Sequence, residues 1–203
     1  MGRLAVRLLS VAGLLVVAAC GGQSTAGPQP TVTSPIAASA TSSAASCTGQ
    51  LTPSETEGPY FKAGSPRRTS LVDAGLGGTR LSLTGRVLNR SCTPVAGARL
   101  DFWQANAAGV YDNSGYRLRG NQLTDAEGRY SLQTIVPGLY PGRTEHIHVK
   151  VQPAGKSTLT TQLYFPGVSR NQDDSIFDAR LLINVLESKS ALTASFDFIV
   201  DAG

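Results

Sequence analysis

Six short runs in which apolar and polar residues alternate restrict this chain to an all-β fold. The runs lie at 80–88, 99–105, 129–135, 146–152, 160–165 and 194–200. Successive side chains of a strand point to opposite faces, so an alternating run has one face to bury and one to leave in water. Gly, Pro, Asn and Asp separate the runs, as they do in turns between strands. The pattern indicates an antiparallel sandwich or barrel over 47–203, with one short helix or irregular loops at 173–188. Of the two, we predict the β-sandwich with long loops.

Residues 1–20 have the features of an export signal. Arg3 and Arg7 precede an apolar run, and small residues lead to Cys20. A basic start, an apolar stretch and a small-residue cleavage site define a secretory signal, and the run is too short for an ordinary spanning helix. The ending VAAC resembles a bacterial lipobox, which implies that Cys20 is lipidated and anchors an exported protein at the extracytoplasmic face of the cell membrane. A short buried helix and a signal cleaved elsewhere are the alternatives.

Residues 21–46 read as a linker. Of these 26 residues, 22 are Ser, Thr, Ala, Pro or Gly, and none is charged or aromatic. Such a segment buries too little apolar surface to offset its chain entropy. We therefore predict a disordered tether between the lipid anchor and the folded domain. A segment that folds on a partner is the alternative, and nothing specific in the sequence favours it.

The net charge gives no reason to expect a nucleic-acid partner. The chain has 18 Lys and Arg, and removing the two arginines of the signal leaves 16 basic residues against 14 acidic ones. The basic residues form no cluster that could follow a phosphate backbone. The expected partners are therefore small molecules, together with the membrane through the lipid alone.

Two cysteines remain for the folded domain once Cys20 is assigned to the lipid. They are Cys47 and Cys92. An even count in an exported, oxidising setting favours a disulfide between them, which would pin the start of the domain to its first hairpin. Two free thiols are the alternative.

The only two histidines of the chain, His146 and His148, lie two residues apart in the run 146–152. In a strand they point to the same face, where two imidazoles can bind one metal ion. The alternative is a pair of polar residues on a solvated face, and periodicity alone does not decide between the two. Tyr140 precedes them in a turn rich in Pro and Gly. A tyrosinate is a hard anionic donor with a free pKa of about 10, so ferric iron is the ion that suits it, unless the ring only packs at the turn.

Other metal and nucleophile motifs are absent from the sequence. It contains no His-Glu-x-x-His pattern, which excludes the common zinc protease arrangement. It contains no Gly-x-Ser-x-Gly element and no convincing Ser, His and Asp set. Any metal site must therefore be completed by oxygen donors.

Five segments occur in an order that matches a known family. They are LTPSETEGPY at 51–60, FWQANAAGVY at 102–111, TDAEGRYS at 124–131, IVPGLYPGRTEHIH at 135–148 and TQLYF at 161–165. Together they resemble the intradiol ring-cleavage dioxygenases, and protocatechuate 3,4-dioxygenases in particular. The resemblance covers nearly all of 51–167, whereas the C-terminal third matches poorly.

The resemblance implies a mononuclear, non-haem Fe(III) site with four protein ligands. These would be Tyr111, Tyr140, His146 and His148. Two tyrosinates and a hydroxide would balance the charge of the ion, which permits burial. A catechol-type substrate would react there with O2 and open to a muconate-type diacid. Tyr140 would also act in catalysis, because a displaced tyrosinate can accept a proton from the catechol.

The same resemblance implies roles for three residues that are not ligands. Arg143 would stabilise negative charge that builds up on the substrate, and Gln162 would form a hydrogen bond to a ligand or to the reacting group. Both would contact the substrate, and Tyr60 would line the substrate mouth. A surface ion pair for Arg143 and simple packing for Tyr60 are the alternatives.

Two other functions compete with the enzyme. One is a tethered module that binds ferric iron or catecholate ligands without cleaving them, and the other is a structural surface domain without a metal. A sandwich fold hosts many functions and does not decide among them. The positions of Arg143 and Gln162 favour the enzyme, because a binding module would need neither. The sequence leaves open which catechol is used and whether the protein forms a homo-oligomer.

Overall fold

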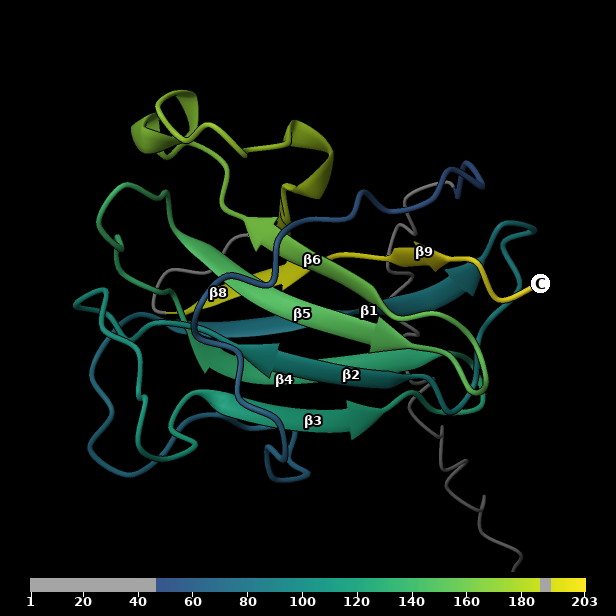
Figure 1. Ribbon diagram of the computed structural model, residues 1–203, viewed down its shortest axis with the longest axis horizontal. Coiled ribbons are helices and arrows are strands. Elements are labelled where there is room, and N and C mark those ends of the chain that lie inside the picture. Colours follow the sequence, from purple (N-terminus) through teal and green to yellow (C-terminus); the bar gives the residue numbers. More distant parts are fainter. Residues whose placement is uncertain (1–46, 187–190) are drawn as a thin grey trace, which may run out of the picture. The chain divides into compact units, whose positions relative to one another are not determined.

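The computed structural model describes residues 47–186 and 191–203 of this chain (Figure 1). The signal predicted for 1–20, the lipidated Cys20 and the linker predicted for 21–46 lie outside the described residues and stay predictions. No helix in the described part has the length and apolar character needed to cross a membrane.

Two facing sheets form a β-sandwich. The first sheet has the strand order β3(Arg119–Leu123), β2(Arg99–Trp103), β5(His146–Gln152) and β6(Leu159–Tyr164). The second has the order β4(Arg129–Ile135), β1(Arg80–Asn89), β8(Leu192–Ser195) and β7(Asn184–Val185), and β9(Phe198–Val200) pairs with the end of β1. Figure 1 shows β2, β3, β5 and β6 in front of β1 and β4. The predicted all-β sandwich is confirmed.

The strands differ from the sequence pattern in three places. β3 was not predicted, because its sequence RGNQL has no apolar alternation. The run 194–200 divides into two strands, β8 and β9, and both pair with β1 in parallel rather than antiparallel. The described part of 173–188 holds one short helix, the 3₁₀ helix η2(Ala179–Leu181), as predicted, and it adds the unpredicted two-residue strand β7; a second 3₁₀ helix, η1(Ser169–Gln172), precedes this range.

Gly85 explains why the last run breaks where it does. A Cβ at this position would lie 1.8 Å from the carbonyl oxygen of Phe196, between β8 and β9. The Phe196 N–H donates to Thr84 O at 3.0 Å, an ordinary length for a backbone hydrogen bond. Only a glycine lets the two backbones approach so closely, so the crossing of 196 over β1 depends on it.

The core lies between the sheets and comes from one face of each strand. β4 alternates exposed and buried residues along most of its length, as its sequence predicts. β5 is different, because it is buried on both faces. Ile147, Val149 and Val151 enter the core between the sheets, while the segment 51–61 crosses the opposite face (Figure 1). Hydrogen bonds from β6 hold this segment, since Thr161 Oγ1 donates to Pro53 O at 2.7 Å. The histidine face of β5 is therefore covered and not solvated.

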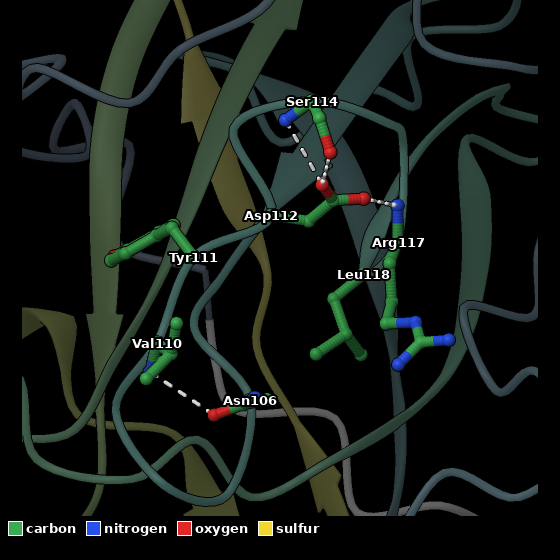
Figure 2. A pocket seen from close by; sticks show the side chains of 7 residues that line it. All are labelled: Asn106, Val110, Tyr111, Asp112, Ser114, Arg117 and Leu118. Atoms are coloured by element: carbon green, nitrogen blue, oxygen red, sulfur yellow. Dashed lines mark hydrogen bonds between the residues drawn. The ribbon is translucent and has the colours of Figure 1, made fainter.

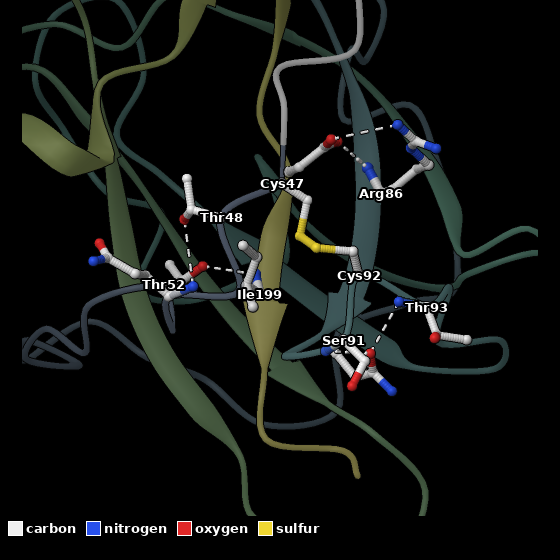
Figure 3. The surroundings of a disulfide bond; sticks show 11 residues. Cys47, Thr48, Thr52, Arg86, Ser91, Cys92, Thr93 and Ile199 are labelled. Atoms are coloured by element: carbon white, nitrogen blue, oxygen red, sulfur yellow. Dashed lines mark hydrogen bonds and ion pairs between the residues drawn. A yellow bond between two sulfur atoms is a disulfide. The ribbon is translucent and has the colours of Figure 1, made fainter.

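A disulfide joins Cys47 to Cys92, with 5.9 Å between their Cα atoms (Figure 3). It links the start of the described chain to the turn that follows β1. Thr52 stands just beyond it and exchanges two hydrogen bonds with Ile199 of β9, at 2.8 and 2.9 Å. The first residues of the domain are thus attached to the second sheet at two places before the chain crosses to the first.

Candidate metal centre

β5 presents His146 and His148 side by side on its covered face. Their exposed fractions are 4% and 2%, which excludes the solvated pair considered above. β2 and β6 flank the strand, and the register places Trp103 and Gln162 opposite His148. The Trp103 ring stacks on the His148 ring with 4.8 Å between centroids and 6° between planes. The histidine rings are therefore held by packing on rigid strands.

Three donor atoms from Tyr111, His146 and His148 converge. Tyr111 Oη lies 3.2 Å from His146 Nε2, and this nitrogen lies 3.1 Å from His148 Nε2. His146 Nδ1 lies 2.6 Å from the carbonyl oxygen of Thr144, which can only accept a hydrogen bond. The ring proton of His146 is therefore on Nδ1, and its Nε2 lone pair faces the other imidazole.

Tyr140 lies beside these three residues and packs its ring against Tyr111. Its ring meets the Tyr111 ring edge-on with 5.9 Å between centroids. Its hydroxyl lies 2.8 Å from the hydroxyl of Tyr60. Tyr140 is half-buried, whereas Tyr111 is buried. The four ligands that the resemblance implies thus lie in one cluster, with Tyr140 as its most exposed member.

Two glycines lock the loops that carry the tyrosines. A Cβ on Gly109 would lie 2.0 Å from Leu139 O, and a Cβ on Gly138 would lie 2.3 Å from Ala107 O. The Gly138 N–H donates to Asn106 O at 2.9 Å. The two loops therefore touch backbone to backbone, and this contact fixes the spacing of Tyr111 and Tyr140.

We expect Gly138→Ala to destabilise the protein by about 1–3 kcal/mol, because its new methyl group would overlap a backbone oxygen that cannot rotate away. Retention of any metal held by Tyr111 and Tyr140 should also fall, since the two loops must separate. Thermal unfolding and metal analysis of the purified variant would measure both effects. Gly77→Ala is the control, because a Cβ there meets nothing within 4 Å. Equal melting of both variants would contradict this account of the loops.

Burial sets the protonation of the cluster. It lowers the pKa of His146 to about 4 and the pKa of His148 well below its ordinary value. Both imidazoles are therefore neutral near pH 7 and keep lone pairs for a metal. Burial also raises the pKa of the Tyr111 phenol, against the opposing charges of Arg143 and Arg119. This phenol would ionise at neutral pH only beside a strongly charged cation.

The donor set fits ferric iron. Within the described residues, no three His, Cys, Asp or Glu side chains gather into a group that could hold a metal, so any metal here needs the tyrosines. Two neutral imidazoles and two phenols that can become anionic suit a hard trivalent ion. The opposed Nε2 atoms of His146 and His148 point to the same conclusion, because a cation between them would satisfy both lone pairs.

Arg143 belongs to a buried network and not to a surface ion pair. Its Nε donates to Asp174 Oδ2 at 2.8 Å, and one Nη donates to Gln162 Oε1 at 2.7 Å. The Asp174 side chain is fully buried. Burial alone would raise the pKa of Asp174, but hydrogen bonds from the Thr144 N–H and from Arg143 lower it below its ordinary value. Asp174 was not predicted as a site residue, because no motif surrounds it in the sequence.

Both polar atoms of the Gln162 side-chain amide form hydrogen bonds. Its Oε1 accepts from Arg143, and its Nε2 donates to Thr56 O at 2.9 Å. The bond to Thr56 ties β6 to the segment that covers the histidines. The predicted contacts of Arg143 and Gln162 with substrate stay predictions. The Arg143 charge nevertheless acts on the cluster, since it helps to lower the pKa values of His146 and His148.

A cleft of about 360 Å³ lies beside the Tyr111 loop (Figure 2). It is lined by Asn106, Val110, Tyr111, Asp112, Ser114, Arg117 and Leu118. In Figure 2 the Tyr111 side chain points away from Leu118 and Arg117. Tyr111 is the only one of the four clustered residues that lines this cleft, so the cleft borders the donor cluster at Tyr111 alone.

The known proteins that this chain resembles are dioxygenases. A family model described as Dioxygenase matches residues 56–202. The beta chain of protocatechuate 3,4-dioxygenase from Burkholderia cepacia is 34% identical over 152 residues, which cover 61% of this chain and 65% of that protein. Hydroxyquinol 1,2-dioxygenase from Rhizobium sp. (strain MTP-10005) is 30% identical over 171 residues, which cover 71% of this chain and 55% of that protein. The alignments thus span between half and two thirds of these curated relatives.

A solved structure is similar over three quarters of this chain. It is the dioxygenase domain of a dioxygenase and carbohydrate-binding protein fusion from the cellulolytic bacterium Streptomyces sp. SirexAA-E. It is 52% identical with a TM-score of 0.74, and the match covers 76% of this chain and 100% of that one.

Proposed function

Because this chain belongs to the intradiol ring-cleavage dioxygenase family, we propose that it cleaves a catechol-type ring with O2 between the two hydroxyl-bearing carbons. We propose that Fe(III) is held by Tyr111, Tyr140, His146 and His148. The observation that carries this proposal is the convergence of Tyr111 Oη and the two histidine Nε2 atoms, with neighbouring donors 3.1 and 3.2 Å apart. The product would be a muconate-type diacid.

A ferric ion bound by these residues would supply the Lewis acid that activates a catechol toward O2. The protein residues would do the rest of the work. Tyr140 Oη is the proton acceptor that fits best, because Tyr140 is the more exposed of the two tyrosines and reaches the cluster from its edge.

Arg143 would stabilise negative charge on the substrate. Asp174 and Gln162 hold its guanidinium in place, so little motion is needed when charge develops. Because Asp174 is fully buried and Arg143 is 20% exposed, the pair is shielded from most screening by water. Trp103 stacks on the His148 ring and would hold this ligand in its orientation.

The test is aerobic turnover by iron-loaded protein with catechol, protocatechuate and hydroxyquinol. We expect a visible tyrosinate-to-iron band that shifts on addition of a catechol and decays as product forms. With ¹⁸O₂, both oxygen atoms should appear in the ring-opened diacid, as mass spectrometry would show. A band that shifts without turnover would favour a binding module. A colourless protein that retains no iron would overturn the proposal.

We also propose that the protein is exported and anchored by a lipid on Cys20. The signal-like sequence of 1–20 supports this location. The Cys47–Cys92 disulfide supports it as well, because such bonds persist in oxidising compartments. Mass spectrometry of the mature N-terminus would test it, and an unmodified or retained 1–20 segment would contradict it.

A further inference from the structure

Tyr60 touches both tyrosines of the donor cluster. Its ring stacks on the Tyr111 ring with 4.4 Å between centroids and 18° between planes. It meets the Tyr140 ring edge-on at 5.4 Å, and the hydroxyls of Tyr60 and Tyr140 lie 2.8 Å apart. Simple packing would not require this last contact, which joins two polar atoms across 80 residues of sequence.

The backbone of Tyr60 is held as firmly as its side chain. Arg119, which is only 2% exposed, donates from Nη1 to Tyr60 O at 2.6 Å. The same guanidinium donates to Asp112 O at 2.9 Å, directly after Tyr111. Arg119 therefore ties the segment of Tyr60 to the loop of Tyr111. Two residues before Tyr60, Gly58 lies against the His148 ring, where an added Cβ would be 3.3 Å from Cε1.

We propose that Tyr60 is a positioning residue for the ligand tyrosines, donating its hydroxyl proton to Tyr140 Oη while its ring covers Tyr111. The inference rests on the proposed function, because it takes Tyr140 and Tyr111 as iron ligands. The direction of the hydrogen bond then follows from chemistry. A ligand tyrosinate has no proton to give, so Tyr60 must be the donor and must itself stay protonated.

This hydrogen bond should weaken Tyr140 as an electron donor. A hydrogen bond to a charged oxygen is stronger than one between neutral groups, and it stabilises the negative charge on that oxygen. More energy is then needed to move an electron from the tyrosinate to iron. The stack on Tyr111 limits the access of water to that ring as well. A residue outside the ligand set thus adjusts how strongly both tyrosines donate.

The experiment compares the absorption spectra of iron-loaded wild type, Tyr60→Phe and Tyr116→Phe. Tyr60→Phe keeps the stacked ring and removes only the hydroxyl, so we expect its tyrosinate-to-iron band to move to longer wavelength. Tyr116→Phe is the matched control. It also removes a phenol hydroxyl near this segment, one that donates to Ala63 O at 2.9 Å, but it contacts neither ligand tyrosine. Its band should coincide with that of the wild type.

The outcomes separate this inference from the proposed function. A coloured Tyr60→Phe protein whose band matches that of the wild type would overturn the inference and leave the iron site intact. Colourless wild-type protein would overturn the proposed function and, with it, the inference. If Tyr60→Phe melts far below the control, resonance Raman spectra of the wild type in H2O and D2O replace it. A shift of the tyrosinate C–O stretch on deuteration would support the bond, and an unchanged stretch would overturn it.

Discussion

Replacing His148 by Ala is expected to abolish iron retention and, with it, ring cleavage. His148 Nε2 lies 3.1 Å from His146 Nε2, and the ring is 2% exposed, so no water or neighbouring side chain can take its place readily. Loss of an outer partner of a metal ligand costs about 10–100-fold in affinity or activity, and loss of a ligand should exceed that. Metal analysis and the visible band of the purified variant measure the effect. His148→Ala protein that retained one iron per chain with an unchanged band would contradict the ligand role.

Two further variants separate metal binding from packing. Gln152→Ala is the control on the same strand, because Gln152 is exposed at the end of β5, and it should retain iron normally. Tyr111→Phe keeps the ring that stacks on Tyr60 but lacks the oxygen next to His146. This variant should therefore melt like the wild type and lose the part of the tyrosinate-to-iron band that Tyr111 contributes. If the domain were purely structural, none of these proteins would hold iron, and His148→Ala would change stability alone.

The alternation of apolar and polar residues predicted the strands well where one face of each strand is buried and the other is exposed. β4 fits this description, and its ends at 129 and 135 match the sequence prediction. β3 pairs with β2 along its whole length, yet its sequence carries no such pattern. The parallel pairing of β8 and β9 with β1 could not be predicted, because it depends on the connection from β6 and on the close approach at Gly85.

The candidate site was predictable only in part, because local periodicity reports only those site residues that share one strand. His146 and His148 share a face because they lie two apart in one strand, so local periodicity reveals them. The tyrosines come from two separate loops. Tyr140 could be singled out because its turn lies just before the histidine strand, whereas only the family resemblance brought Tyr111 into the site. Asp174 and Arg119 carry no motif, and their roles depend on partners distant in sequence, such as Arg143 for Asp174 and Tyr60 for Arg119. Contacts of that kind are set by tertiary packing, which local sequence patterns do not report.

Loss of the Cys47–Cys92 disulfide is expected to lower the free energy of unfolding by about 4 kcal/mol. The bond closes a loop with a sequence separation of 45, and a loop of that size loses about this much entropy in the unfolded chain. For a domain of this length, that corresponds to a fall in Tm of about 8–16 °C. Thermal unfolding of Cys47→Ser/Cys92→Ser protein would measure it. Ser91→Ala is the control, because it changes an exposed residue beside Cys92 without touching this bond.

The same variant should keep its iron band, since the segment that covers the site has attachments of its own. Thr52 bonds to Ile199, Gln162 donates to Thr56 O, and Arg119 donates to Tyr60 O. These bonds lie between the disulfide and the donor cluster, so cutting the disulfide should free only the residues before Thr52. A double variant with a lower Tm and the wild-type spectrum would show that the disulfide contributes to stability alone. A spectrum that changes together with the melting temperature would mean that the disulfide also sets the position of Tyr60.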